Sequence, residues 1–444
     1  MTVFVLINIL FNLSHQTSFT KIYPLRIITL IVLIGLVGLS SIEVSGQNPI
    51  NKQGVPVPLG FVMPNGLKKV SIPFELHDNL IVIKVLLNRA LPLSFILDTG
   101  VRTTVLTEKT FMDLLNLSYS RKIVIPGVGG EKLVDAYVAN DVTITVGNIE
   151  GRGHALLVLE EDLLQLKNYL GVNVHGIIGY ELFSRFIVKI NYGSRQITFY
   201  DPDKYKKKMS YSRLPLQVED TKPYITASVV QPNGSTLDGK FMIDTGASHS
   251  ILLDQSSDSS IVINDRHIFT NLGRGLGGNI FGNVGRVAEL SISKYDFKDV
   301  IAIYPEKEHY DVDLSANYRN GSLGGGILSR FVVMLDYIHG YLYLKKGPKY
   351  HKPFEFNLSG LVVRAAGRNL HDYYIDNIRD GCSAAGAGLI VGDKIQNVNG
   401  ESTNNLGLDD LIGILNKKAN KRIRMVVLRN NQLFTKTFVL ERTI

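Results

Sequence analysis

The feature that most constrains this chain is an internal duplication. The segment FILDTG at residues 95–100 returns as FMIDTG at residues 241–246, an offset of 146 residues. Further along each copy, GIIG at 176–179 followed by LFSRF at 182–186 returns as GSLG at 321–324 followed by ILSRF at 327–331, an offset of 145 residues. Two unlike motifs that keep nearly one spacing indicate that a single structural unit occurs twice.

The pattern within each copy predicts a mostly β fold. Short alternating or apolar segments are separated by Gly, Asn and Asp turns from Val70 to about Lys346. Each copy opens alike, with IPFEL at 72–76 and LIVIKV at 80–85 set against LPLQV at 214–218 and YITASV at 224–229. We therefore predict lobe one at residues 70–205 and lobe two at residues 206–347.

Composition excludes several classes of site. The chain has 444 residues, 45% of them hydrophobic, and a net charge of +8, so two or three domains are expected. The basic residues are scattered, and the densest run, at 206–208, is only three residues long. This distribution indicates no nucleic-acid partner. Cys382 is the only cysteine, and the histidines lack a metal-ligand spacing. No metal and no other cofactor is expected.

The N-terminal segment predicts export from the cytoplasm. Lys21 and Arg26 precede an apolar run at residues 27–39, and small residues follow up to Gly46. This run is too short for an ordinary bilayer span, so residues 1–46 are predicted to be a secretory signal peptide. An uncleaved signal anchor, attached to the membrane, is the alternative. Either one predicts a secreted or cell-envelope (periplasmic) protein, and residues 47–69 have the composition of a linker.

The repeated Asp-Thr-Gly segments predict chemistry. Asp98 and Asp244 each follow an apolar strand, and a fold tolerates a buried carboxylate mainly where a site uses it. Two carboxylates held close together cannot both ionise readily, so they share one proton. One can then take a proton from water while the other polarises a carbonyl. This arrangement would hydrolyse a peptide bond without a metal.

At these residues the chain resembles the pepsin and retropepsin superfamily of aspartic peptidases, over residues 70–347. The resemblance implies a two-lobed acid-protease fold, polypeptide substrates and a catalytic pair formed by Asp98 and Asp244. It also implies that an apolar strand ending in glycine crosses behind each loop, at 177–179 and 323–324. The residues implied to support the pair are Thr99, Gly100, Thr245, Gly246 and Ser248. The substrate-covering flap would include Gly127, Gly129 and Gly130, with residues 273–278 as its counterpart in lobe two.

The chain departs from the family pattern at several positions. Arg102 stands where Ser248 stands in lobe two, and we expect it to point outward while Thr103 or Thr104 supports Asp98. Ser322 interrupts the second crossing strand, and no flap tyrosine is evident, which places the chain closer to the retropepsin-like branch. The residues after the two glycines, at 101 and 247, carry no hydroxyl to favour ionised carboxylates. We therefore predict a less acidic pH optimum than that of pepsin.

Residues 355–442 resemble a PDZ domain of the type found in bacterial envelope proteases. The resemblance rests on DGCSAAGAGL at 380–389, VGD at 391–393 and VNG at 398–400. It implies a small α+β domain that binds C-terminal or extended peptides through the loop at Gly360, Leu361 and Val362. Alternatively, Gly360 only begins a strand. Cys382 is expected to be a small packing residue.

Two functions remain from the sequence. The first is an aspartic endopeptidase whose PDZ domain presents protein substrates. The second is a catalytically weak or inactive peptide-binding scaffold in the cell envelope. Two intact Asp-Thr-Gly segments favour the enzyme, whereas Arg102 and the missing flap tyrosine favour the scaffold.

Overall fold

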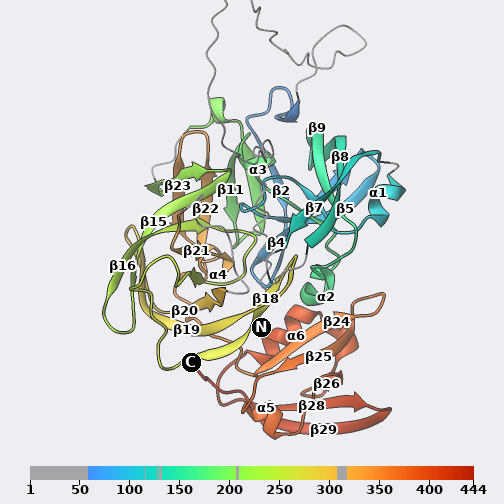
Figure 1. Ribbon diagram of the computed structural model, residues 1–444, viewed down its shortest axis with the longest axis vertical. Helices are drawn as coiled ribbons and strands as arrows, with labels where there is room; N and C mark the ends of the chain where they lie inside the picture. Colours follow the sequence, from blue (N-terminus) through green and yellow to red (C-terminus); the bar gives the residue numbers. More distant parts are fainter. Residues whose placement is uncertain (1–58, 116, 128, 130–132, 207–209, 308–317) are drawn as a thin grey trace, which may run out of the picture.

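The computed structural model describes residues 59–444 apart from 116, 128, 130–132, 207–209 and 308–317 (Figure 1). The predicted signal segment at residues 1–46 and Gly130 of the predicted flap therefore lie outside the described residues. Within the described part of the chain, no helix is long and apolar enough to cross a membrane.

Lobe one is built on a nine-stranded sheet in the order β1-β9-β6-β10-β5-β4-β8-β7, with β3 paired to β4. The strands alternate buried and exposed side chains or run fully apolar, as their β-branched residues favour. Their bounds are β1 (Gly60–Val62), β3 (Glu75–His77), β4 (Leu80–Leu87), β5 (Leu91–Leu97), β6 (Val105–Leu106), β7 (Tyr119–Pro126), β8 (Leu133–Val146), β9 (Ile149–Leu159) and β10 (Gly176–Ile178).

Lobe two repeats this arrangement in an eight-stranded sheet, in the order β14-β15-β16-β21-β17-β20-β19-β18. In both lobes a short crossing strand runs parallel to the strand that ends at the aspartate, β10 beside β5 and β21 beside β16. The bounds are β14 (Gln217–Glu219), β15 (Lys222–Val230), β16 (Thr236–Ile243), β17 (Ile251–Leu253), β18 (Ile268–Gly275), β19 (Gly278–Ile292), β20 (Tyr295–Pro305) and β21 (Gly321–Leu323).

A third sheet of six strands joins the two lobes (Figure 1). Its order is β13-β23-β22-β11-β12-β2, and β11 of lobe one pairs with β22 of lobe two, Val188 opposite Leu335. One backbone ladder therefore runs through both lobes and fixes their relative position. The bounds are β2 (Lys69–Pro73), β11 (Ile187–Asn191), β12 (Gln196–Tyr200), β13 (Ser212–Pro215), β22 (Phe331–Asp336) and β23 (Tyr341–Lys346).

Residues 355–442 form a separate sheet in the order β24-β25-β26-β28-β29, with β27 paired to β26. The bounds are β24 (Leu361–Ala366), β25 (Asp372–Ile378), β26 (Lys394–Val398), β27 (Glu401–Ser402), β28 (Arg422–Arg429) and β29 (Gln432–Val439). The α-helices are short: α1 (Thr110–Leu114), α2 (Leu166–Leu170), α3 (Tyr180–Phe183), α4 (Gly325–Leu328), α5 (Ser383–Gly386) and α6 (Leu408–Leu415). Among the described residues, single-turn 3₁₀ helices cover Pro202–Lys204 and Thr403–Asn405.

The stretch interpreted as a linker contains a strand. Within residues 47–69, β1 pairs with β9, and Phe61 in β1 is only 3% exposed. Its ring lies 4.5 Å from the ring of His154, centroid to centroid. Burial of this one aromatic side chain explains why so short a segment orders despite its Pro and Gly content.

The hairpins that lead to the two aspartates differ in length, which corrects the alignment of the repeats. Val82 pairs with Ile96 in lobe one, and Tyr224 pairs with Met242 in lobe two, in each case two residues before the aspartate. Val82 precedes Asp98 by 16 residues, whereas Tyr224 precedes its aspartate by 20. The equivalent offset is thus 142 in these strands, because the β15–β16 hairpin is four residues longer than the β4–β5 hairpin.

Candidate active site

The two Asp-Thr-Gly loops are built in the same way. The amide of Asp98 donates to the carbonyl of Ile178 in β10 at 2.9 Å, and the amide of Asp244 donates to the carbonyl of Leu323 in β21 at 2.9 Å. Gly179, which directly follows β10, lies behind the first loop, because a Cβ there would stand 1.9 Å from the carbonyl oxygen of Asp98. The crossing strands therefore hold both loops in place, as the resemblance implied.

The threonines lock the loops together across the lobe interface. The Thr99 amide donates to the Thr245 hydroxyl at 3.1 Å, and the Thr245 amide donates to the Thr99 hydroxyl at 3.0 Å. The Thr99 hydroxyl in turn donates to the carbonyl of Ile243 at 2.6 Å, and the Thr245 hydroxyl donates to the carbonyl of Leu97 at 2.9 Å. All of these groups are buried, so the reciprocal hydrogen bonds hold the two loops in one arrangement.

Both carboxylates are buried, and that of Asp98 lies against the loop of lobe two. Asp98 is 2% exposed and Asp244 is 5% exposed. The amide of Gly100 donates to Oδ1 of Asp98 at 2.6 Å, and the amide of Gly246 donates to Oδ1 of Asp244 at 3.0 Å. A Cβ on Gly246 would lie 2.1 Å from Cγ of Asp98, so the first carboxylate packs directly against the second loop. Only glycine leaves the room for this approach.

The two carboxyl groups differ in acidity. Burial raises the pKa of Asp98 well above its usual value, and the nearby charge of Asp244 raises it further. Burial also raises the pKa of Asp244, to about 6, but the positive charge of Arg319 and the Gly246 amide oppose that rise. Asp244 is therefore the first of the pair to ionise, and Asp98 retains the shared proton.

Two cations beside the pair were not found from the sequence. Lys222 is 4% exposed and Arg319 is 3% exposed, and the charge of Lys222 lowers the pKa of both catalytic carboxyls. Nη1 of Arg319 lies 3.1 Å from the sulfur of Met242, two residues before the second aspartate. The sequence does distinguish them, because each cation stands where lobe one has an apolar residue. This difference is visible only when the two repeats are aligned with the correct offset.

Tyr337 was also missed. Its hydroxyl is buried without a hydrogen-bond partner among the described residues, and its ring stacks on Phe183 with centroids 5.5 Å apart. Burial raises the pKa of Tyr337 well above its usual value, and the charges of both catalytic aspartates add to that effect. The hydroxyl therefore stays protonated near the pair and is able to donate a hydrogen bond there.

Arg102 points away from the catalytic pair. Its side chain is 45% exposed, and Nη1 lies 3.3 Å from a carboxylate oxygen of Asp220 in lobe two. Thr104 does not support Asp98 as we had expected, because its amide and hydroxyl both donate to the carboxylate of Glu181. Burial raises the pKa of Glu181 to about 7, against the two hydrogen bonds from Thr104.

The polar residues of the second loop have partners. Ser248 is 1% exposed, and its carbonyl accepts a hydrogen bond from the Asn79 side chain of lobe one at 3.4 Å. The hydroxyl of Ser322, the departure in the crossing strand, lies 2.9 Å from Nε2 of His249. Burial lowers the pKa of His249 to about 3, so the imidazole is neutral. A polar residue in this crossing strand thus pairs with a polar residue of the loop in front of it.

Comparison with known families identifies these domains. A family model described as aspartyl protease matches residues 83–182 and again residues 225–329, and a PDZ domain model matches residues 349–428. The chain carries a duplicated aspartyl protease domain and a PDZ domain. The predicted mostly β, two-lobed fold with a C-terminal PDZ domain is confirmed.

Solved structures and curated proteins add little to this identification. The chain is similar to the crystal structure of basic 7S globulin from soybean, with 11% identity, a TM-score of 0.37, and coverage of 67% of this chain and 100% of that chain. A comparison with curated proteins finds no match.

The glycine-rich flaps of the two protease domains meet at their tips. A Cβ on Gly127 would lie 2.3 Å from the amide nitrogen of Gly277, and one on Gly129 would lie 2.3 Å from the carbonyl oxygen of Gly278. Leu276, at the tip of the β18–β19 hairpin, is 5% exposed and packs into a hydrophobic cluster of lobe one. Both segments that resembled flaps therefore come together, with each lobe supplying one side.

A short segment of lobe one lies between this flap and the PDZ domain. Nε of Arg274, in the lobe-two flap, donates to the carbonyl of Leu163 at 2.6 Å. Helix α2 follows at once, and the Asn168 side chain donates to the carbonyl of Ala365 in β24 at 2.9 Å. A Cβ on Gly171 would lie 2.5 Å from Cβ of Leu408 in α6. Helix α2 thus packs against β24, the terminal strand of the PDZ sheet, and its C-terminal glycine packs against α6.

The predicted carboxylate-binding loop of the PDZ domain is internally bonded. The amide of Gly360 donates to Oδ1 of Asn357 at 3.0 Å, and the amide of Leu361 donates to the hydroxyl of Ser359 at 3.2 Å. Val362 is 7% exposed, and Leu361 and Val362 are the first residues of β24 to pair with β25. A peptide carboxylate could use these amides only by replacing the two side-chain acceptors.

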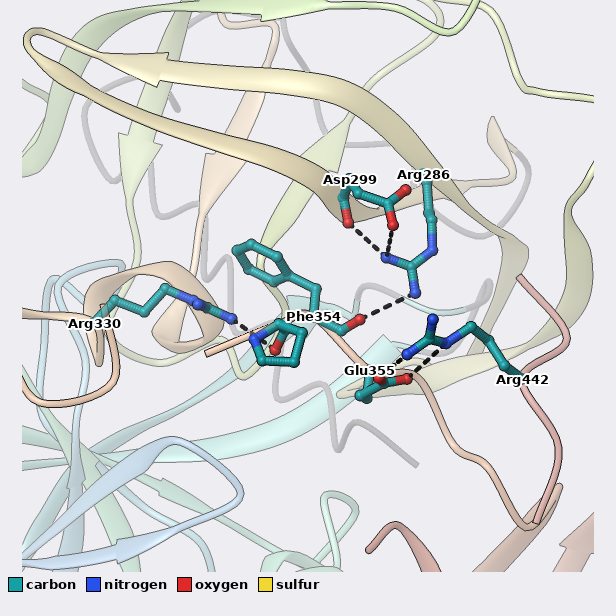
Figure 2. Close-up of polar contacts among 7 residues, drawn as sticks. Arg286, Asp299, Arg330, Phe354, Glu355 and Arg442 are labelled. Carbon is teal, nitrogen blue, oxygen red and sulfur yellow. Dashed lines mark hydrogen bonds and ion pairs between the residues drawn. The ribbon is translucent and has the colours of Figure 1, made fainter. Parts of the chain in front are cut away.

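The connection from the protease domains to the PDZ domain is held by three arginines (Figure 2). The guanidinium of Arg330 lies 3.5 Å from the ring centroid of Phe354 and donates to backbone carbonyls of residues 349–353. Arg286 donates to the Phe354 carbonyl at 3.0 Å, and Arg442 forms an ion pair with Glu355. The connection is therefore a packed element and not a loose tether.

Proposed function

We propose that this protein is an aspartic endopeptidase. The observation that carries the proposal is the reciprocal Thr99–Thr245 lock, which fixes two buried carboxylates of unequal acidity against each other. The lock holds the two carboxylates in one relation, which is what proton sharing between them requires. A duplicated aspartyl protease domain supports the same conclusion.

The unequal acidity of the two aspartates gives each a role in the proposed reaction. Asp244, the first carboxyl to ionise, takes a proton from the attacking water as its oxygen bonds to the substrate carbonyl carbon. Asp98, which holds the shared proton, donates it toward the carbonyl oxygen. The tetrahedral gem-diol then collapses: the C–N bond breaks as the proton on Asp244 passes to the leaving amine, and one hydroxyl of the gem-diol returns its proton to Asp98 as the C=O bond reforms. Flaps that cover the bound substrate would exclude bulk water, which would strengthen each of these interactions.

We further propose that the PDZ domain binds extended or C-terminal segments of polypeptide substrates, and that the protein acts in the cell envelope or outside the cell. The PDZ family match and the edge strand β24 support the first proposal. The basic residues and the short apolar run before residue 40 support the second.

The test replaces each catalytic carboxyl in turn. Wild type should cleave a denatured polypeptide such as casein, with products identified by mass spectrometry. Asp98→Asn and Asp244→Asn should each lower the rate by about 10²-fold to 10⁴-fold, because each removes one partner in the proton transfer. Asp141→Asn, at an exposed position of β8 where the backbone φ is positive, is the matched control and should keep the wild-type rate.

Two outcomes would reject the proposal. If both active-site variants cleave as fast as wild type, the carboxylate pair is not the catalyst. If wild type binds peptides but cleaves none of them over about two pH units on either side of the Asp244 pKa of about 6, the scaffold function replaces the enzyme.

A further inference from the structure

Lys222 lies on the same side of its sheet as the second catalytic aspartate. It stands two residues before Tyr224, and Tyr224 pairs across the ladder with Met242, two residues before Asp244. Cross-strand partners project to one face, and so do residues two apart on a strand. The ammonium group of Lys222 therefore belongs to the face that carries the catalytic carboxylate.

This lysine is buried without a direct partner. Only 4% of it is exposed, yet its ammonium group makes no hydrogen bond or ion pair with any of the described residues. Asp220, the nearest acidic residue in sequence, forms an ion pair with Arg102. Burying an ammonium group in this way is costly. Burial and the charge of Arg319 lower the pKa of Lys222 to about 8, which leaves it protonated at neutral pH. The charges of Asp220 and of the two aspartates of the Asp-Thr-Gly loops oppose this shift through space.

The protease fold itself does not require a cation at this position. The equivalent residue of lobe one is Leu80, which is fully buried in an apolar cluster with Val82 and Ile96. That cluster includes Leu276 from the lobe-two flap, so the same face of lobe one lies against the lid of the site. The sheet face beside Asp98 is therefore apolar, while the face beside Asp244 carries a buried ammonium group without a direct hydrogen-bond partner among the described residues.

We propose that Lys222 is the floor of a substrate subsite that binds a carboxylate of the polypeptide, on the lobe-two side of the catalytic pair. This inference rests on the proposed peptidase function and adds the chemical class of the group that is recognised. The carboxylate belongs either to an Asp or Glu side chain near the scissile bond or to the C-terminus of the peptide. Its arrival would give the ammonium group the direct partner that the protein itself does not provide.

Selectivity follows from the low polarity of the site. A substrate carboxylate gains a charge-assisted hydrogen bond with Lys222 where the closed flaps exclude water, whereas an amide of the same shape gains only a neutral contact. A substrate lacking the carboxylate would leave the buried ammonium group unpaired. Glutamate and glutamine peptides are therefore the matched pair that reports this subsite.

The experiment compares full-length variants at pH 6.5 on peptides that wild type cleaves. Each position near the scissile bond carries Glu or Gln, and each peptide has a free or an amidated C-terminus. At one position, or at the C-terminus, wild type should favour the carboxylate by about tenfold or more in kcat/KM. Lys222→Leu, which installs the lobe-one residue, should bring the ratio close to one, while Lys222→Arg should retain the preference. Lys345→Leu, on an exposed strand position, is the charge-matched control and should keep the wild-type ratio.

The ratio separates this proposal from a general effect on catalysis. A change in the acidity of the catalytic pair alters Glu and Gln peptides alike and leaves their ratio unchanged. A wild-type ratio near one at every position, or a preference that survives in Lys222→Leu, would overturn the subsite. Thermal unfolding establishes that the Leu and Arg variants are folded.

Binding to the Asp98→Asn variant separates the subsite from the peptidase function. Fluorescence anisotropy with the same peptide pairs should show the same carboxylate preference. Preference in binding without cleavage by wild type would reject the peptidase and retain the carboxylate subsite. Cleavage without preference in either measurement would retain the peptidase and reject the subsite.

Discussion

Lobe one and lobe two share one backbone but differ in the residues around the catalytic carboxylates. Leu80 and Val174 of lobe one correspond to Lys222 and Arg319 of lobe two, and all four are buried. The two apolar residues belong to a single hydrophobic cluster, whereas the two cations act electrostatically on the second aspartate.

This difference shows which parts of the half-site are fixed by geometry and which are free to vary. The threonine lock and the crossing-strand glycine recur because backbone atoms approach closely there. The surrounding face needs only to be filled, so its polarity can differ between lobes. Two chemically equal carboxylates acquire unequal acidity in this way, and the division of acid and base roles follows.

Removing the charge of Arg319 should have the largest effect on the difference in acidity between the two aspartates. The charge of Arg319 lowers the pKa of Asp244, so Arg319→Met should raise that pKa above about 6. Because Asp244 must be ionised to act as the base, the acidic limb of kcat/KM should move to higher pH by roughly one unit. Measured pH–rate profiles test this, with the exposed Arg422→Met as control. An unmoved limb would show that lobe two's charge does not set the acidity of its aspartate.

The second contrast is the polar pair behind the loop of lobe two. His249 and Ser322 occupy the positions of Thr103 and Ile177 in lobe one. Ser322→Ala should lower the free energy of unfolding by about 1–3 kcal/mol, because the buried imidazole loses its partner. Adding His249→Thr should cost less in that background than in wild type. Additive losses in this double-mutant cycle, measured by denaturant unfolding, would mean that the two residues do not interact.

The smallest expected effect concerns the contact of lobe one with the PDZ domain. Nδ1 of His77 lies 2.6 Å from a carboxylate oxygen of Asp409 in α6. Burial opposes protonation of His77, but hydrogen bonds and charges from Asp409 and Glu75 outweigh it and raise its pKa. The contact should therefore contribute its full stabilisation of the folded protein below pH 6.5, the unperturbed pKa of histidine. That contribution should be lost as pH rises through the higher pKa of His77 in the folded protein.

Asp409→Asn should reduce this pH dependence, leaving the part due to Glu75, at a cost below about 1 kcal/mol, since the pair is partly exposed. Thermal unfolding at pH 5 and pH 8 measures it, with the exposed Glu401→Gln as control. An equal pH response in wild type and Asp409→Asn would contradict the role of this pair.

Features with a fixed backbone requirement could be predicted from the sequence. Asp-Thr-Gly, the crossing-strand glycines and the flap glycines each follow from close backbone approach, and the duplication doubled the signal. The structure brings all of the described residues among them together at one site. The outward direction expected for Arg102 also agrees with its position beside Asp220.

Features set by side-chain packing could not be predicted from the sequence. Lys222 was hidden because the longer β15–β16 hairpin displaced the alignment, so that Leu80 was set against Tyr224. Thr104 could not be assigned to Glu181 because the two are far apart in the chain. The burial of Phe61 within the expected linker depended on a strand nearly a hundred residues away.

The short stretch at residues 163–171 contacts both the lobe-two flap and the PDZ domain. Its beginning receives the arginine of the lid, and its end rests on the strand edge and helix where a PDZ ligand would add. A peptide that takes that edge must compete with Asn168 for the carbonyl of Ala365. If these nine residues move as one, the two contacts are thermodynamically linked. A peptide that displaces Asn168 then weakens the Arg274–Leu163 hydrogen bond, and opening of that bond raises the affinity for the peptide by the same factor.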